Sequence, residues 1–419
     1  MPGIRGRPGS PRPDFGLPKG LPASDAGQRQ LLERLGRVAT KLGTRAFLVG
    51  GPVRDLLLGR ASPDLDVAVE ASSREFGKVV ALELGGRFLF HSRFLTGTVT
   101  LPDSSHIDIT RTRTESYTRP AVLPRVRPAH IRQDLFRRDF TMNAMALELA
   151  PRSFGRIIDP CNGQIDLSRR IVRVLHDRSF VDDPTRIFRC VRFAVRFGFE
   201  IEERTLRLMR EAVALRYASL LTPERALWEL RLTCAEPLVL QMVEALVKEN
   251  VLQSTWEWTP PESLLPGLAR LVQSRAAPDL IFLFLLSTLP VTDRFPVRRE
   301  ERDAADALNA FGATRARLAR ACKPGAVYRL LHPIPEPALK ILAALEPVRV
   351  SRHIKDQLRV FSHTRPELTG RDLRALGVEP GPRYRAILER LLYARLDGRV
   401  RSREDELRLC RRMLGAGKR

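Results

Sequence analysis

The sequence predicts an α+β protein, with a small mixed sheet in an N-terminal head and only helices after it. Within residues 28–167, helical patterns are interleaved with short runs rich in Phe, Val, Ile and Thr, which are typical of strands. Beyond that segment the apolar spacing is mostly helical. A chain of 419 residues, 43% hydrophobic and 28% charged, is long enough for several domains with cores of their own.

The elements of the head follow from these patterns in order. A helix is expected over 28–42, where Leu31, Leu35 and Leu42 recur at helical spacing. The elements expected after it are a strand at 47–49, a short amphipathic helix at 54–59, an extended run at 64–67, a helix at 72–84 ended by two glycines, and strands at 87–101 and 106–113.

We expect five parts along the chain. They are a disordered basic arm at 1–27, the head at 28–167, a helical neck at 168–235, a helical body at 236–360 and a helical tail at 361–419. The arm is rich in Pro, Gly and Arg and contains no apolar core of signal-peptide length.

Composition narrows the class of partner and the compartment. The formal net charge of +23 favours a polyanion, either a nucleic acid or a membrane surface. The most apolar run, 280–286, is far shorter than the roughly 20 residues of a membrane-spanning helix, so a buried helix is expected there. The five cysteines are scattered, without CxxC pairs or metal-ligand spacing. We therefore expect a cytoplasmic protein without a membrane association.

A glycine turn followed by two aspartates predicts a nucleotide site. Gly50 and Gly51 follow the strand at 47–49, and glycine backbones leave amide groups open to an anion such as a triphosphate. Asp64 and Asp66 lie two residues apart in an extended run, so their side chains share one face. Such carboxylate pairs hold Mg²⁺ together with substrate phosphates. The alternative is an ordinary tight turn followed by solvated aspartates.

Asp108 lies between Ile107 and Ile109, so its side chain faces away from these two. It is either a third acidic ligand beside Asp64 and Asp66, or a hydrogen-bonded residue at the edge of a sheet. The sequence leaves both interpretations open.

A helix near 180–199 carries charged groups that are suited to reading a base. Asp183, Arg186 and Arg189 recur every three residues and therefore share a face. Cytosine and adenine each present an amino donor beside a ring-nitrogen acceptor, which an aspartate and an arginine can recognise. This pair would reject guanine and uracil, whose edges are reversed. The alternative is an arginine-rich helix that packs against acidic neighbours.

These motifs, together with Arg137-Arg-Asp-Phe-Thr-Met-Asn-Ala144, resemble the polymerase-β-like nucleotidyltransferase superfamily. The resemblance is specifically to class II CCA-adding enzymes and their bacterial poly(A) polymerase relatives. It implies that the glycine turn and Arg54 bind the nucleotide together with Arg138, Asp139 and Asn143. It also implies that Asp183 and Arg186 read the base, with Arg189 as a third contact. A structural salt bridge at a helix start is the alternative for the Arg-Asp pair. Arg225 and Glu229 resemble a family element that braces the reading helix.

The resemblance implies an enzyme that adds CMP and AMP from CTP and ATP to the 3′ end of tRNA. It implies Mg²⁺ held by Asp64 and Asp66, with Asp108 as a further catalytic carboxylate, and no stable protein partner. The alternatives are an A-adding or a CC-adding enzyme, a poly(A) polymerase, or an inactive RNA-binding relative. The Pro-rich, basic stretch up to residue 133 looks like the family's flexible loop, whose presence argues against a CC-only enzyme.

Overall fold

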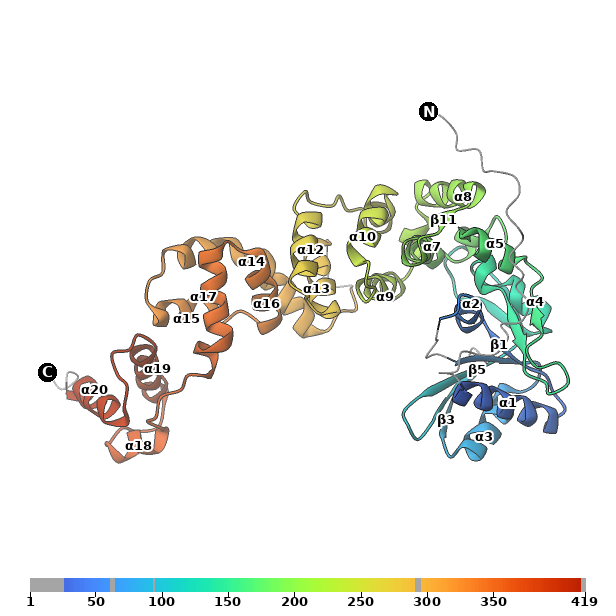
Figure 1. Cartoon of the computed structure of the whole chain (residues 1–419). Helices are drawn as coiled ribbons and strands as arrows, with labels where there is room; N and C mark the ends of the chain where they lie inside the picture. Colours follow the sequence, from blue (N-terminus) through green and yellow to red (C-terminus); the bar gives the residue numbers. More distant parts are fainter. Residues whose placement is uncertain (1–25, 61–64, 93–94, 291–294, 416–419) are drawn as a thin grey trace. The chain divides into compact units, whose positions relative to one another are not determined.

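The computed structural model describes residues 26–60, 65–92, 95–290 and 295–415 (Figure 1). The chain divides into two compact units. The first comprises residues up to 229 together with 245–257, and the second comprises 230–244 and the residues from 258 onward. Most of the arm expected at 1–27 lies outside the described residues. Asp64 also lies outside them.

The first unit contains a seven-stranded mixed sheet in the order β3-β4-β5-β2-β1-β8-β9. Its strands are β1 Ala46–Val49, β2 Leu65–Val69, β3 Arg87–His91, β4 Thr96–Thr100, β5 His106–Arg111, β8 Ala146–Glu148 and β9 Ile157–Ile158. Only the β2 and β5 pair is parallel; the other neighbours are antiparallel. Two small sheets accompany it, β6 Arg113–Ser116 with β7 Arg125–Pro128, and β10 Ile171–Val172 with β11 Glu200–Ile201.

The central strands β1 and β8 are buried along their whole length, so both of their faces are covered. All four residues of β1 are buried. Helices α1 Ala26–Lys41 and α3 Ser73–Leu84 lie together on one side of the sheet (Figure 1). A hydrophobic cluster joins Phe47 and Val49 of β1 to Ile131 and Leu135 of α4 Ile131–Phe136. Strand alternation therefore divides the side chains of β1 between two cores.

The remaining elements of the first unit lead from the head into a group of helices. They are α2 Gly51–Leu57, α4 Ile131–Phe136, η3 Thr141–Asn143, α5 Gly163–Arg169, α6 Ser179–Asp182, α7 Thr185–Phe197, α8 Glu203–Ala214, η4 Tyr217–Leu220 and α11 Val251–Trp256. Helices α9 Pro223–Cys234 and α10 Val239–Lys248 each contribute residues to both units.

The regular elements described in the second unit are all helices. It contains α12 Leu264–Gln273, α13 Pro278–Thr288, α14 Arg299–Arg320, α15 Pro324–Leu331, α16 Glu336–Leu345, α17 Val348–Arg359, η5 Phe361–His363, α18 Gly370–Ala375, α19 Pro382–Leu396 and α20 Arg403–Gly415. One core gathers side chains of α14 to α17 around Phe311 and Ile354. Another joins α18, α19 and α20 around Leu391 and Cys410.

The predicted fold class is confirmed: a small mixed sheet lies in the N-terminal part and helices follow it. The run expected as one strand at 87–101 forms two antiparallel strands, and 106–113 is divided between β5 and β6. The apolar run at 280–286 lies in α13 and is largely buried, as expected. The boundaries at 167, 235 and 360 stay a prediction. None of the described helices combines the length and apolar character needed to cross a membrane.

Gly36 provides a test of this packing. An added Cβ at Gly36 would lie 1.8 Å from the carbonyl oxygen of Leu149, so Gly36→Ala must displace α1 from the end of the sheet. We expect a loss of about 2–3 kcal/mol in the free energy of unfolding, measured by denaturant titration. Gly312→Ala is the control, because nothing lies within 4 Å of its added Cβ in α14. Equal stability of the two variants would contradict the described position of α1.

Candidate active site

The glycine turn connects β1 to α2 and lies against Arg138. Gly50 has φ 74°, in the left-handed region, and an added Cβ would lie 2.7 Å from Arg138 Nη1. Glycine is therefore required here both by the backbone and by the close guanidinium. The Gly50 amide donates to the Met145 carbonyl at 3.2 Å, so that amide is not open to an anion. Of the two glycines, Gly51 remains the predicted source of an amide for phosphate.

The sheet brings two of the predicted carboxylates side by side. Asp66 of β2 pairs in register with Asp108 of the parallel strand β5, and each lies between buried neighbours, so both side chains share one face. Leu48 pairs with Val67, which places Asp66 at the end of the sheet where β1 enters the glycine turn. Asp108 also accepts a hydrogen bond from Thr98 Oγ1 at 2.6 Å, so both interpretations of this residue have support.

Two adjacent carboxylates fit the oxygen ligands that hard divalent ions prefer. No cluster of three or more potential metal ligands is found among the described residues, but Asp64 lies outside them. Asp64 is two positions before Asp66, where an extended chain would return to the same face. The donor set therefore fits a divalent ion, while a role for Asp64 stays a prediction.

Arg138 is positioned by a cluster of arginines around buried carboxylates. Asp134 is fully buried and accepts bonds from Arg137 Nε and Arg138 Nη2 at 3.0 and 3.2 Å. Burial alone would raise the pKa of Asp134, but Arg137 and Arg138 hold it below the usual range. Glu115 accepts from Arg137 Nη1 at 2.9 Å. Within the described part of the chain, Arg138 Nε is buried without a hydrogen-bond partner.

Asp139 lies at the centre of a buried relay. Its Oδ2 accepts from Arg189 Nε and Nη2 at 2.8 and 2.6 Å, while Oδ1 accepts from the Phe140 amide and from Asn143 Nδ2 at 2.8 and 3.0 Å. Asn143 Oδ1 in turn accepts from Arg54 Nη1 at 2.7 Å. Burial would raise the pKa of Asp139, but Arg189 and Asn143 outweigh it and hold the pKa at about 2. The relay joins α2, η3 and α7.

Arg54 is held as a buried cation. Its Nε and Nη2 atoms each donate a hydrogen bond to Asp55 at 2.9 Å. Its guanidinium lies 4.6 Å from the ring centroid of Phe197. Burial lowers the pKa of Arg54, although Asp55 opposes this shift. The Asp55 carboxylate and the aromatic face compensate for the lost hydration of the guanidinium.

The side chains that the sequence predicts to read the base lie at the break between α6 and α7 and on the first turns of α7. Asp183 is partly exposed, and its Oδ1 accepts from the amide and hydroxyl of Thr185 at 3.1 and 2.6 Å. Arg186 is buried and donates to Ser179 Oγ at 2.7 Å and to the Arg137 carbonyl at 2.8 Å. Each of these two guanidinium nitrogens carries a second N–H, so three of the five donors of Arg186 have no partner among the described residues.

The sequence interpretation did not identify Asp134 and Glu115. The spacing Asp134, Arg137, Arg138 is a usable signal for Asp134, because residues three and four apart on a helix meet. Glu115 lies on β6, and its contact with Arg137 depends on how distant segments pack. No local pattern predicts that contact.

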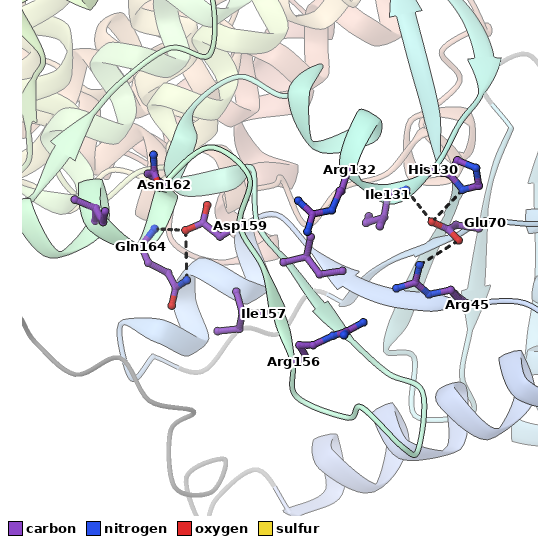
Figure 2. Close-up of a pocket in the computed structure, with 12 residues that line it drawn as sticks. Arg45, Glu70, His130, Ile131, Arg132, Arg156, Ile157, Asp159, Asn162 and Gln164 are labelled. Carbon is purple, nitrogen blue, oxygen red and sulfur yellow. Dashed lines mark hydrogen bonds and ion pairs between the residues drawn. The ribbon is translucent and has the colours of Figure 1, made fainter.

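A hollow lies beside the start of β1 and the end of β2 (Figure 2). Its volume is about 720 Å³, and Arg45, Glu70, His130, Arg132 and Arg156 line it together with several isoleucines. Arg45 pairs with both Glu70 and Glu148, and Arg156 pairs with Glu148. Glu70 and Glu148 therefore neutralise two of the three arginines that line this hollow.

Comparison with known proteins decides the family. Residues 46–173 match the family model described as the poly A polymerase head domain. The chain is 32% identical to an A-adding tRNA nucleotidyltransferase of Halalkalibacterium halodurans over 392 residues, covering 91% of this chain and 92% of the relative. The chain belongs to the tRNA nucleotidyltransferase/poly(A) polymerase family. It is therefore a nucleotidyltransferase, and enzymes of this family depend on a metal ion.

Other members of this family are similar over most of the chain. A CC-adding tRNA nucleotidyltransferase of Deinococcus radiodurans is 34% identical over 378 residues, which cover 89% of this chain and 90% of the relative. A CCA-adding enzyme structure, apo form II, matches with a TM-score of 0.80 and 29% identity over 94% of this chain and 96% of that chain. The shared fold includes the helical part as well as the head.

The Asp139 relay predicts a pH dependence of stability. Because the pKa of Asp139 falls from its ordinary 3.8 to about 2 on folding, its contribution is complete above pH 4 and is lost as the pH falls through 2. We expect the difference in unfolding free energy between the wild type and Asp139→Asn to shrink by about 2 kcal/mol between pH 5 and pH 2. The exposed Asp303→Asn on α14 should show no such trend. A pH-independent difference for Asp139→Asn would contradict the relay.

Gly50→Ala tests the close approach of Arg138 to the turn. The new methyl group must displace Arg138 Nη1, so we expect the KM for the nucleotide to rise about tenfold or more while the protein stays folded. Gly43→Ala also places a side chain at a positive φ, 63°, but has no atom within 4 Å of the added Cβ, so its KM should not change. Similar kinetics for both variants would show that strain, and not Arg138, is responsible.

Proposed function

We propose that this protein adds CMP and AMP from CTP and ATP to the 3′ end of tRNA without a nucleic-acid template. The observation that carries the proposal is the in-register pair of Asp66 and Asp108 beside the glycine turn. The names of the relatives from Halalkalibacterium halodurans and Deinococcus radiodurans support tRNA as the acceptor. The excess of 71 Lys and Arg over 48 Asp and Glu suits such a polyanion.

We propose Mg²⁺ as the metal ion, held by Asp66 and Asp64 with Asp108 as a third carboxylate. When bound, it would neutralise the triphosphate and lower the pKa of the tRNA 3′-hydroxyl. Attack of that hydroxyl on the α-phosphorus forms the new phosphodiester bond, and pyrophosphate leaves. The protein itself contributes charge and position.

Arg138 is the side chain proposed to meet the triphosphate or the sugar. It lies against the glycine turn, and its buried Nε has no partner among the described residues. A bound oxygen atom would satisfy this donor. Asp139 is proposed to act in the same place, although all its acceptor positions are filled by Phe140, Asn143 and Arg189. A ribose hydroxyl would therefore have to share or replace one of these bonds.

The base is proposed to lie against the Asp183 and Arg186 pair. Asp183 Oδ2 has no donor among the described residues, so it is available for the amino group of cytosine or adenine. Arg186 has N–H groups left for the ring nitrogen. Arg189 would contribute through Asp139, because two of its nitrogens are bound there.

An A-adding enzyme is the second candidate. It is favoured by the name of the Halalkalibacterium halodurans relative, 92% of whose length this chain covers. The two candidates are separated by incubating the protein with Mg²⁺ and tRNA transcripts that end before CCA, after C or after CC. Sequencing the products made with CTP, ATP or both should show a complete CCA end on the shortest transcript. Addition of AMP to the CC end alone would establish the A-adding enzyme.

Substitution of the paired carboxylates tests the catalytic role. Asp66→Asn and Asp108→Asn should each lower kcat by about a hundredfold or more, because each removes a negative ligand from the reacting phosphate's metal ion. The affinity for tRNA should not fall. Asp103→Asn, in the turn between β4 and β5, is the matched control and should keep its activity. Full activity of both Asp66→Asn and Asp108→Asn would refute the proposed site.

A further inference from the structure

Asp108 lies in a row of side chains that crosses one face of the sheet. The strand register pairs Asp108 of β5 with Asp66 of β2 on one side and with Thr98 of β4 on the other. Neighbouring strands lie about 4.8 Å apart, so side chains in such a row are close enough to interact. The Thr98 hydroxyl donates to Asp108 Oδ1 at 2.6 Å. Asp108 is therefore placed between a hydrogen-bond donor and a second carboxylate.

The neighbours of Thr98 in β4 fix the direction of its side chain. Gly97 and Val99 are buried, and an added Cβ at Gly97 would lie 2.5 Å from Phe88 Cε2, so the backbone of β4 packs directly on this ring. Because successive side chains of a strand point to opposite faces, Thr98 points to the face that carries Asp108. Its β-branched side chain also has a restricted χ1. Packing on the opposite face thus holds the hydroxyl donor in position.

The bond from Thr98 distinguishes the two oxygens of Asp108. Asp108 is exposed, so packing does not fix the orientation of its carboxylate. Oδ1 accepts from the Thr98 hydroxyl, and no described residue donates to Oδ2. The two interpretations that the sequence leaves open for Asp108 are therefore compatible, because one oxygen is hydrogen-bonded at the sheet and the other remains for a ligand.

We infer that Thr98 is a positioning residue, which binds Asp108 Oδ1 and thereby presents Oδ2 beside Asp66 as a ligand for the metal ion. This inference rests on the proposed function, in which Asp108 is the third carboxylate of the site. Groups that orient a metal ligand change metal affinity or activity by about ten- to a hundredfold when they are removed. Without the Thr98 hydroxyl, the exposed Asp108 side chain loses the hydrogen bond that orients it.

Thr98→Val is the decisive variant, because valine nearly keeps the shape of threonine and lacks the hydroxyl. The first readout is the Kd for Mn²⁺ of the protein without nucleotide or tRNA, measured from the electron paramagnetic resonance signal of free Mn²⁺. The second readout is kcat and KM for ATP on a tRNA that ends in CC. We expect the Mn²⁺ Kd to rise about tenfold, kcat to fall about tenfold, and KM to change by less than about twofold.

Two variants on the same strand separate positioning from packing. Thr98→Ser keeps the hydroxyl and should return both readouts to within about threefold of the wild type. Thr100→Val removes a hydroxyl from the same face of β4, but Thr100 pairs in register with His106 and not with a carboxylate. It should change neither readout. A loss of strand packing, in contrast, would affect Thr98→Val and Thr100→Val alike.

An Asp108→Ala background tests whether Thr98 acts through Asp108. This substitution removes the acceptor of the Thr98 hydroxyl, so the further change Thr98→Val should alter the Mn²⁺ Kd and kcat by less than about twofold. Losses that add in the double variant would overturn the inference, because Thr98 would then act through another group.

The remaining outcomes separate this inference from the proposed function. An unchanged Mn²⁺ affinity in Thr98→Val would overturn the positioning role, and so would equal losses in Thr98→Val and Thr98→Ser. A wild-type protein that binds no Mn²⁺ would overturn the assignment of Oδ2 as a ligand. If the wild type binds Mn²⁺ but adds no nucleotide to any tRNA, the proposed function fails, while the metal titration still tests Thr98. An active wild type with an unaltered Thr98→Val variant contradicts the inference alone.

Discussion

The ion pair between Asp139 and Arg189 is the contact on which the geometry of the site depends. It joins the segment after α4 to the middle of α7, and the bond from Asn143 extends it to Arg54 beside the glycine turn. Because both oxygens of Asp139 are fully used, neither its carboxylate nor the Arg189 guanidinium is free to change rotamer independently. The turn proposed to bind phosphates and the helix proposed to read the base are thus held by one continuous set of hydrogen bonds.

Charge explains why this set is built from arginines and buried carboxylates. A chain with a net charge of +23 must keep its cations apart or neutralise them locally. Around the site, Glu115, Asp134 and Asp139 each hold one or two arginines in place. The arginines then remain charged in a fixed position, where they would attract an anionic substrate without having to reorganise first.

The sequence was sufficient for features that depend on neighbouring residues. The strand at 47–49, the helix at 72–84 and the end of α7 at Gly198 follow from local apolar patterns and from glycine in the left-handed region. The pairing of Asp66 with Asp108 depends on β2 and β5 lying parallel in the sheet, which no local pattern specifies. That is why the sequence left the role of Asp108 open.

The sequence also did not predict which groups form hydrogen bonds with the charged side chains of the site. Helical spacing applies to Arg186 and Arg189, which both lie on α7, whereas Asp183 lies in the extended break before that helix. The spacing gave no information on the hydrogen-bond partners of these side chains. Arg186 donates to Ser179, which lies across the break before α7, and to the carbonyl of Arg137, which is distant in sequence. The Gly50 amide likewise donates to the distant Met145 carbonyl. Tertiary packing determines such contacts, so a motif identifies candidate residues without giving the state of each donor and acceptor.

A double-mutant cycle between Arg54 and Arg189 tests the relay most directly. Hydrogen bonds through Asn143 and Asp139 link these two residues, and both guanidinium groups also lie over the ring of Phe193. The measured quantity is kcat/KM for ATP on a tRNA that ends in CC, for the wild type, Arg54→Lys, Arg189→Lys and the double variant. A continuous relay predicts an interaction free energy of at least about 1 kcal/mol. Effects that add to within about 0.3 kcal/mol would contradict it and show that the turn and the reading helix act independently.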